Sequence, residues 1–485
     1  MLCIPRRLQD STIYLTEMRL TVAFLTVATA ALNAFPESDI TPEFKLPGEW
    51  TYADAADPAT ESPCQSGWWR KFEDPLLDSL ISRGIQNNYN VAAAARRIAI
   101  ARASVGSARA GYYPVIGVSG GYTKSRSSGD AFATGGDPSK VSHWDLGASL
   151  SWEIDVFGRV RKSVEAGKSN VSISRADRAG VELALQAEIA TAYINLRVEQ
   201  AQLNVANEHS QRQHKALNIA EARFETGLAS MLDVDQARQV YYSTIASIPM
   251  LENAIHADIS TIATLLGVTV GEVEPVLAQP RPLPSYFQLV QSGVPADLLD
   301  SRPDVVAAAR TIDMYASRLG IAKKEWLPTV SVNASAGTLA HDAKDLFTDN
   351  SFNYSIAPTI SWTVFDGLAR KYNIISAREQ LQEAVDNYNQ TVLTAIQEAD
   401  NAMSAYRSYL KYIKALDDVV ASAAEYDTRS LDSYKNGLTP YINVANAQMS
   451  YLEDMNTLIV AKGNALNALV SLYKALGGGW RETER

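Results

Sequence analysis

The chain has 485 residues, of which 46% are hydrophobic and 8% aromatic, and its formal net charge is −10 at pH 7. An isoelectric point near 5.2 leaves no basic stripe to neutralise phosphates, which argues against nucleic acid as a partner. Two cysteines, Cys3 and Cys64, and five scattered histidines form neither a disulfide framework nor a metal motif. His209 and His214 are five residues apart, so we expect solvated surface positions rather than a pair of metal ligands.

Residues 1–34 predict a secretory signal peptide. An apolar run of thirteen residues from Leu20 to Leu32 follows a basic residue, with small residues for cleavage at Ala28 and Ala30. The run is shorter than the roughly 20 residues of a membrane-spanning helix, and a buried amphipathic helix is the alternative. Met18 is a second candidate for the start of the chain. Residues 35–66 are proline-rich and polar, which predicts an extended segment packed around helices, with a disordered tail as the alternative.

Two parts of the chain repeat each other. The stretch SWEIDVFGRVR from residue 151 is echoed by SWTVFDGLAR from residue 361, and RFETGLASMLDVDQAR from residue 223 by SYKNGLTPYINVANAQ from residue 433. We therefore predict a first repeat at residues 67–267 and a second at 293–477, each in the order helix, strand, strand, very long helix, helix. A wandering, proline-rich connector at 268–292 joins the repeats, and a tail at 478–485 follows them.

Each repeat contains two predicted strands. The stretch 145–155 alternates strictly, which places Leu146, Leu150 and Trp152 on one apolar face, and stretches 115–122, 329–337 and 354–364 are the other strands. Pro358 is expected near a strand end or at a bulge, because proline cannot donate a ladder hydrogen bond.

Each repeat also contains one predicted long helix. Between Gly367 and Gly437 there are 69 residues without glycine or proline, which predicts a helix of roughly 100 Å. Residues 167–227 predict a matching helix. Its apolar stripe consists of Val181, Leu185, Ile189, Ala192 and Leu196.

Four strands of about ten residues have the length that crosses a membrane, and aromatic residues end their apolar faces. A water-soluble sheet packed on helices is the alternative, but the long helices leave no compact core for it. A membrane tolerates no open sheet edge, and four strands cannot close a barrel. Several chains must therefore each contribute four strands, and two chains would give eight, three twelve and four sixteen. The aromatic residues are Tyr112, Tyr113, Trp152, Trp326 and Trp362.

Five stretches in this order resemble the TolC-like outer-membrane factor family, the exit ducts of bacterial tripartite efflux pumps, and within it the drug and metal efflux branch. They are GWWRKFEDPLLDSL at 67, IPMLENAIHADISTIATLLG at 248, GVPADLLDSRPDVVAAAR at 293, SWTVFDGLAR at 361, and the two GL turns with their flanks. The resemblance covers roughly residues 60–477.

The resemblance implies an α+β membrane protein of the bacterial outer membrane. Three chains would form a homotrimer with a twelve-stranded barrel, four transmembrane strands from each chain, continued by a long α-helical barrel across the periplasm. The implied partners are outer-membrane lipid, a periplasmic adaptor protein and an inner-membrane RND-type pump, with no cofactor. Members of this branch often carry a lipid on a cysteine after the signal peptide. Here the stretch ATAALNAF has no junction of a small residue with a cysteine, and Cys64 lies in ESPCQ, which argues against a lipid anchor.

Two turns carry the candidate adaptor-docking residues. Each turn ends a long helix with a glycine that can adopt the left-handed C-cap conformation. The role of ending the helix would by itself explain each glycine. The resemblance implies that both turns form the periplasmic tip to which the adaptor docks, with exposed leucines supplying the contact. The six residues are Thr226, Gly227, Leu228, Asn436, Gly437 and Leu438.

The resemblance also implies a pore gate beyond these turns. Asp233 matches the acceptor and Tyr434 the hydroxyl donor of a latch that pinches the helices together, with a solvated Asp and a packing Tyr as the alternative. Thr439 stands where some members carry a latch arginine, and Asn443 and Asn446 where some carry a ring of aspartates. A neutral amide ring predicts weak cation selectivity and weak block by divalent cations at this constriction.

No Ser-His-Asp grouping, glycine-rich phosphate loop or isolated acid pair suggests catalysis, so we expect a passive conduit and not an enzyme. The predicted function is an exit duct for drugs, metals or other toxic small molecules. The alternatives are an exit duct for type I polypeptide secretion and a periplasmic coiled-coil scaffold without a pore.

Overall fold

The computed structural model describes residues 67–126, 128, 140–284 and 301–480. The predicted signal peptide, the segment at 35–66 and both cysteines lie outside these residues. The described chain divides into two compact units, one within residues 99–172 and 309–387 and one within 67–98, 173–308 and 388–480.

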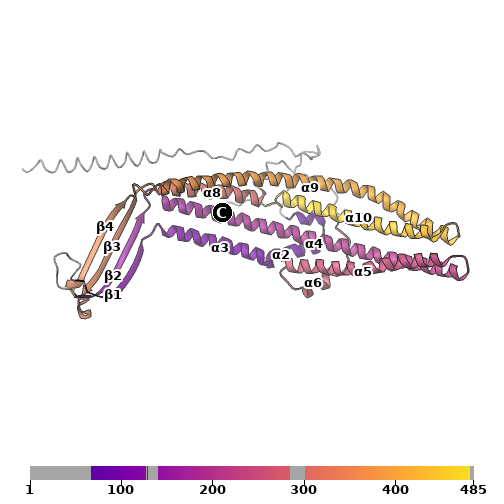
Figure 1. The fold of residues 1–485 in the computed structure, drawn as a ribbon, viewed down its shortest axis with the longest axis horizontal. Helices are drawn as coiled ribbons and strands as arrows, with labels where there is room; N and C mark the ends of the chain where they lie inside the picture. The colour runs from indigo at the N-terminus through magenta and orange to yellow at the C-terminus, as the bar shows by residue number, and fades with distance from the viewer. Residues whose placement is uncertain (1–66, 127, 129–139, 285–300, 481–485) are drawn as a thin grey trace, which may run out of the picture. The chain divides into compact units, whose positions relative to one another are not determined.

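The first unit contains a four-stranded antiparallel sheet in the order β1-β2-β3-β4 (Figure 1). All four predicted strands are confirmed, although β4 ends before Trp362 and Val364. The strands are β1 (Val115–Arg126), β2 (Lys140–Ile154), β3 (Thr329–Ala340) and β4 (Phe352–Ser361).

The strand register joins the apolar residues of all four strands into one face. Leu150 lies opposite Ile116 of β1 and opposite Ala334 of β3, which in turn lies opposite Ile356 of β4. Because side chains alternate along a strand, this one row fixes which residues share its face. We call this side the apolar face. It consists of Ile116, Val118, Gly120, Tyr122, Trp144, Leu146, Ala148, Leu150, Trp152, Ile154, Val330, Val332, Ala334, Ala336, Thr338, Ala340, Phe352, Tyr354, Ile356, Pro358 and Ile360. Beyond Tyr122 and Trp144 the same side of the sheet carries the polar residues Lys124, Arg126, Lys140 and Ser142.

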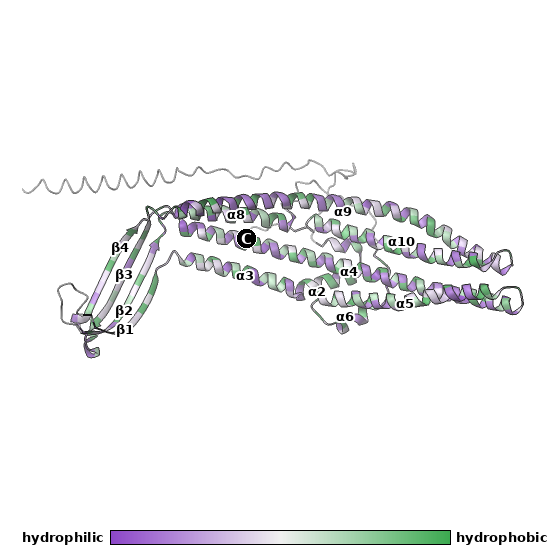
Figure 2. Ribbon diagram, viewed as in Figure 1, coloured by the Kyte–Doolittle hydropathy of each residue, from purple (hydrophilic) through white to green (hydrophobic). Residues whose placement is uncertain are grey.

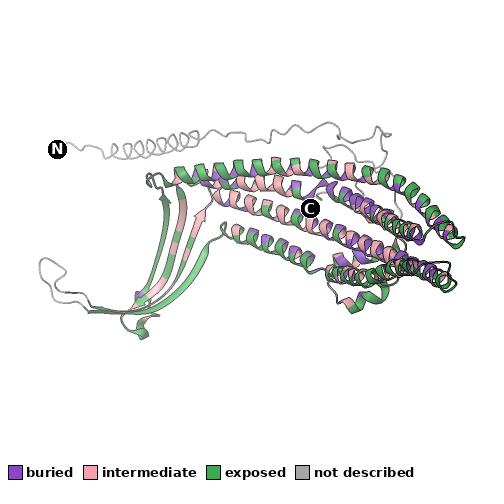
Figure 3. Ribbon diagram, turned by 45° about the vertical axis from the view of Figure 1, so that its right-hand side comes forward, coloured by how far each residue is buried: buried purple, intermediate pink, exposed green. Residues whose placement is uncertain are grey.

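None of the described residues of the first unit covers the apolar face. No residue of β1 to β4 is buried, as Figure 3 shows, and Val118 and Tyr354 remain 77% and 72% exposed. The opposite face is mostly serine, threonine, asparagine and glycine, so the two residue types alternate along each strand (Figure 2). Within the described residues the outer edges of β1 and β4 have no strand partner.

Pro358 pairs with Val332 in an unbroken register without a bulge, and it lies three residues before β4 ends, as expected for a position near a strand end. β4 is an edge strand, where a missing backbone donor can face away from the sheet.

Most of the remaining described chain is helical, and each repeat contains one very long helix. Both predicted long helices are confirmed, because α4 and α9 each run for 67 residues. α4 begins before the expected Gly167, since the Asp155 carboxylate accepts hydrogen bonds from the backbone N–H groups of Val160 and Arg161. The helices are α2 (Pro75–Asn87), α3 (Tyr89–Ala110), α4 (Arg159–Glu225), α5 (Met231–Leu265), α6 (Val270–Leu277), α8 (Pro303–Lys324), α9 (Ala369–Lys435) and α10 (Tyr441–Ala475).

The largest core lies in the second unit. The predicted stripe of α4 packs there, with Leu185, Ile189 and Leu196 at most 4% exposed. Trp68 is buried against this stripe and stacks on Tyr473 of α10, with 5.3 Å between ring centroids.

Two expectations about this unit are wrong. The predicted wandering connector contains α6, because a capping box of Thr269 and Glu272 starts the helix and buried Val273 and Leu277 hold it despite an internal proline. His209 is buried and not solvated: its ring lies 4.9 Å from that of Tyr451, and burial lowers its pKa to about 4.

The described helices include none that is both long enough and apolar enough to cross a membrane. Among the same residues, no three His, Cys, Asp or Glu side chains are grouped so that they could hold a metal ion.

Candidate functional site

The two turns that join α4 to α5 and α9 to α10 are the first part of the candidate site. Gly227 and Gly437 adopt the left-handed conformation, with φ of 71° and 74°. The N–H of Leu228 donates to Arg223 O at 2.8 Å, and the N–H of Leu438 donates to Ser433 O at 2.9 Å. Both turns are therefore Schellman caps, and the expected glycine geometry is confirmed.

The tip of each turn is an exposed leucine. Leu228 is 68% exposed and Leu438 is 79% exposed. The polar side chains beside them bond to their own helices, Thr226 to Ala222 O at 3.1 Å and Asn436 to Asp432 O at 2.8 Å. These internal bonds leave the leucines as the accessible apolar groups of the turns.

Arg223, which the sequence did not single out, joins the two turns. Its guanidinium donates from Nη1 to Lys435 O at 2.7 Å and from Nη2 to Leu228 O at 3.3 Å. The same group lies 5.1 Å from the centroid of the Tyr434 ring. One cation in the last turn of α4 thus bonds a carbonyl of its own turn and the last carbonyl of α9, where the helix dipoles favour positive charge.

The predicted latch residues do not bond to each other in the part of the chain that the structure describes. Asp233 forms a capping box with Ser230, each side chain accepting from the other residue's backbone N–H at 3.3 Å. Tyr434 is 2% exposed and packs edge-on against Tyr441, and its hydroxyl bonds to no described residue. Burial, and then the negative charge of Asp233, raise the pKa of Tyr434.

The predicted amide ring residues differ in their surroundings. Asn443 is half-buried, and its Nδ2 donates to Thr439 Oγ1 at 2.6 Å, so the residue at the latch-arginine position pairs within its own helix turn. Asn446 is exposed and lines a cavity.

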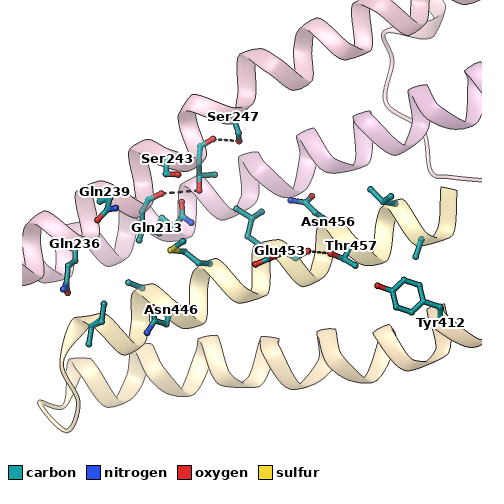
Figure 4. Close-up of a pocket in the computed structure, with 18 of the residues that line it drawn as sticks. Gln213, Gln236, Gln239, Ser243, Ser247, Tyr412, Asn446, Glu453, Asn456 and Thr457 are labelled. Atoms are coloured by element: carbon teal, nitrogen blue, oxygen red, sulfur yellow. Dashed lines mark hydrogen bonds between the residues drawn. The ribbon is translucent and has the colours of Figure 1, made fainter. Parts of the chain in front are cut away.

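That cavity is a groove of about 950 Å³ between α5 and α10, floored by α4 and α9 (Figure 4). Its polar lining is almost entirely amide and hydroxyl, and Glu453 is the single charged residue among its described lining. The polar residues include Gln213, Gln236, Gln239, Ser243, Ser247, Tyr412, Asn446, Glu453, Asn456 and Thr457.

The outer membrane efflux protein family model matches residues 80–268 and 294–478 of this chain. The toluene efflux pump outer membrane protein TtgC of Pseudomonas putida is 28% identical over 448 residues, which cover 91% of this chain and 92% of TtgC. The solvent efflux pump outer membrane protein SrpC of Pseudomonas putida is 30% identical over 411 residues, covering 84% of this chain and 86% of SrpC.

The structure of the outer-membrane channel OprN superposes with a TM-score of 0.83 and 27% identity. The match covers 91% of this chain and 99% of OprN. The resemblance to TolC-like channels is thereby confirmed, and this chain belongs to the outer membrane efflux protein family and is located in the outer membrane.

Proposed function

We propose that the protein is the exit duct of a tripartite efflux system and passively conducts small toxic molecules out of the cell. A periplasmic adaptor and an inner-membrane RND-type pump would deliver the cargo and supply the energy. The names of the relatives support small organic cargo, since they describe efflux of toluene, solvents and antibiotics.

The observation that carries this proposal is the uncovered apolar face. Its side chains would lose the hydrophobic stabilisation of burial in water, whereas lipid tails cover such a face without penalty. The two unpaired edges, on β1 and β4, would then pair with neighbouring copies, because hydrocarbon offers no hydrogen bonds to open edges. Three copies give twelve strands, which is wide enough for a lumen lined by the polar face.

The turns and the residues beyond them have separate roles in the proposal. Leu228 and Leu438 dock the adaptor, because exposed leucines beside glycine caps can enter apolar pockets of a partner hairpin. The gate consists of Asp233 and Tyr434 as the latch and Asn443 and Asn446 as a neutral ring.

Single-channel recording in a planar bilayer tests both the duct and the latch. We expect small, stable conductance steps from the wild type and much larger steps from Asp233→Ala combined with Tyr434→Phe. Ser230→Ala is the matched control, since it removes the same capping box but keeps the carboxylate. Equal conductance in all three proteins would exclude the latch, and well-folded oligomers that never conduct would exclude the duct.

A further inference from the structure

The groove between α5 and α10 is bordered by corresponding residues of the two repeats. Gln236 of α5 corresponds to Asn446 of α10 and Ser247 to Thr457, and all four line the groove. Helices related by rotation about a barrel axis present corresponding residues to the same side of the wall. The groove therefore opens toward one side of the helical wall. In the proposed duct we assign that side to the lumen, because the groove lining contains Asn446 of the predicted pore ring.

One pair of corresponding residues differs in charge. Ser243 of α5 corresponds to Glu453 of α10, and both line the groove. Glu453 is exposed, and its carboxylate forms no ion pair with any residue that the structure describes. None of the other described lining residues is charged, so no cation of the lining neutralises Glu453. The groove therefore has an uncompensated negative charge.

The floor of the groove holds an amide without hydrogen bonds. Gln213 of α4 is 1% exposed, and neither its Nε2 nor its Oε1 bonds to a described residue. Figure 4 shows its side chain between α5 and α10 on the groove side. A buried amide without partners destabilises a fold, which indicates that a water molecule or a ligand completes it.

We propose that this groove binds organic amines in transit, with Glu453 as the counter-charge and the Gln213 amide as a hydrogen-bond partner. The proposal rests on the proposed duct function and names a substrate class for it. A divalent metal ion fits the groove less well, because the groove has a single carboxylate to balance two positive charges. Among the described residues no three His, Cys, Asp or Glu side chains are grouped to hold such an ion. An ammonium group needs one carboxylate and nearby acceptors, which the groove supplies.

The first experiment titrates spermidine, a triamine, into the detergent-solubilised protein by calorimetry, and in parallel measures spermidine block in a bilayer. We expect Glu453→Gln to weaken binding and block by about fivefold, the effect of one partly exposed ion pair. Ser243→Glu should strengthen both, since it adds the carboxylate that the first repeat lacks. Glu252→Gln is the control, because Glu252 is an exposed carboxylate of α5 outside the groove lining.

The outcomes separate the two proposals. If Glu453→Gln and Glu252→Gln bind spermidine as the wild type does, the amine site is wrong while the duct can still stand. If folded wild-type oligomers bind spermidine but do not conduct, the duct is wrong and the site stands.

Gln213→Leu provides a second test. If Gln213 is an amide kept for a ligand, its replacement should weaken spermidine binding and raise the thermal unfolding midpoint, because an unpaired buried amide is removed. A lower midpoint together with unchanged binding would show a purely structural glutamine and overturn its role.

Discussion

At the scale of single residues, Arg223 has the strongest predicted effect on the turns. Its hydrogen bonds to two backbone carbonyls and its position over Tyr434 hold the ends of α4 and α9 together. We expect Arg223→Ala to destabilise this end by about 1.5–3 kcal/mol, the range for hydrogen bonds to a charged group, and to increase channel opening. Thermal unfolding followed by circular dichroism and single-channel recording measure the two effects.

Arg238→Ala is the matched control for Arg223→Ala. Arg238 pairs with Glu221 at 2.9 Å, but both side chains are about two-fifths exposed, and such surface pairs contribute little. Arg238→Ala should therefore leave the opening frequency unchanged. Opening frequencies that rise equally in both variants would point to general loss of positive charge rather than to the contacts of Arg223.

The turn glycines could be predicted from sequence because the requirement for positive φ is local. Arg223 could not, because Lys435, whose carbonyl it binds, is 212 residues away in sequence. The burial of His209 was missed for the same reason, since helical spacing alone does not tell that Tyr451 covers it. Two features of the sequence could have drawn attention to Arg223. It is a basic residue in the last turn of a helix, where the helix dipole favours positive charge, and the second repeat has a serine at the corresponding position.

At the scale of elements, a pair of carboxyl groups couples the packing of α4 and α5 to pH. Burial and mutual repulsion raise the pKa of Glu199 to about 7 and, mainly through burial, that of Asp258 to about 6. Because the pKa values are raised in the folded state, the pair contributes its full stability to folding below about pH 4. At that pH both carboxyl groups are protonated in the folded and in the unfolded protein. This contribution is lost as pH rises through 6 and 7.

We therefore expect the helical part to have a higher unfolding midpoint at mildly acidic pH than at slightly alkaline pH. Glu199→Gln should remove most of this difference by raising the alkaline midpoint, because it replaces a charge that burial disfavours. Glu252→Gln, which changes an exposed carboxylate of α5, should keep the difference. Thermal melts at the two pH values measure it, and a Glu199→Gln protein with the same pH dependence as the wild type would refute the role of the pair.

The long helices were predictable because glycine and proline are the residues that most strongly interrupt a helix. The 69 residues between Gly367 and Gly437 contain neither, and the residues between Gly167 and Gly227 contain no proline and one glycine, Gly180. The connector helix α6 was not, because Pro275 within an eight-residue helix suggests irregular structure. What stabilises α6 is burial of Val273 and Leu277 in the core, and that tertiary contact is invisible in local sequence.

At the scale of the whole molecule, the sheet would connect one chain to its neighbours in the proposed duct. The apolar face was predictable from alternation in each strand, but its continuity across all four strands depends on the register. The predicted trimer adds the closure of β4 of one chain onto β1 of the next, a head-to-tail contact that forms a ring only at the right copy number.

Neighbouring residues of β2 on opposite faces allow this arrangement to be tested directly. Ala148 lies on the apolar face and Ser149 on the polar face, and both are exposed within the chain. We expect Ala148→Arg to cost about 2–4 kcal/mol at mid-membrane and to reduce assembly, whereas Ser149→Arg should insert normally and alter only conduction. Outer-membrane fractionation and chemical cross-linking measure the result, with cross-linked products ending at three chains for the wild type. Products ending at two or four chains would replace the twelve-stranded barrel by one of eight or sixteen strands, and equal insertion of both variants would show that the apolar face does not contact lipid.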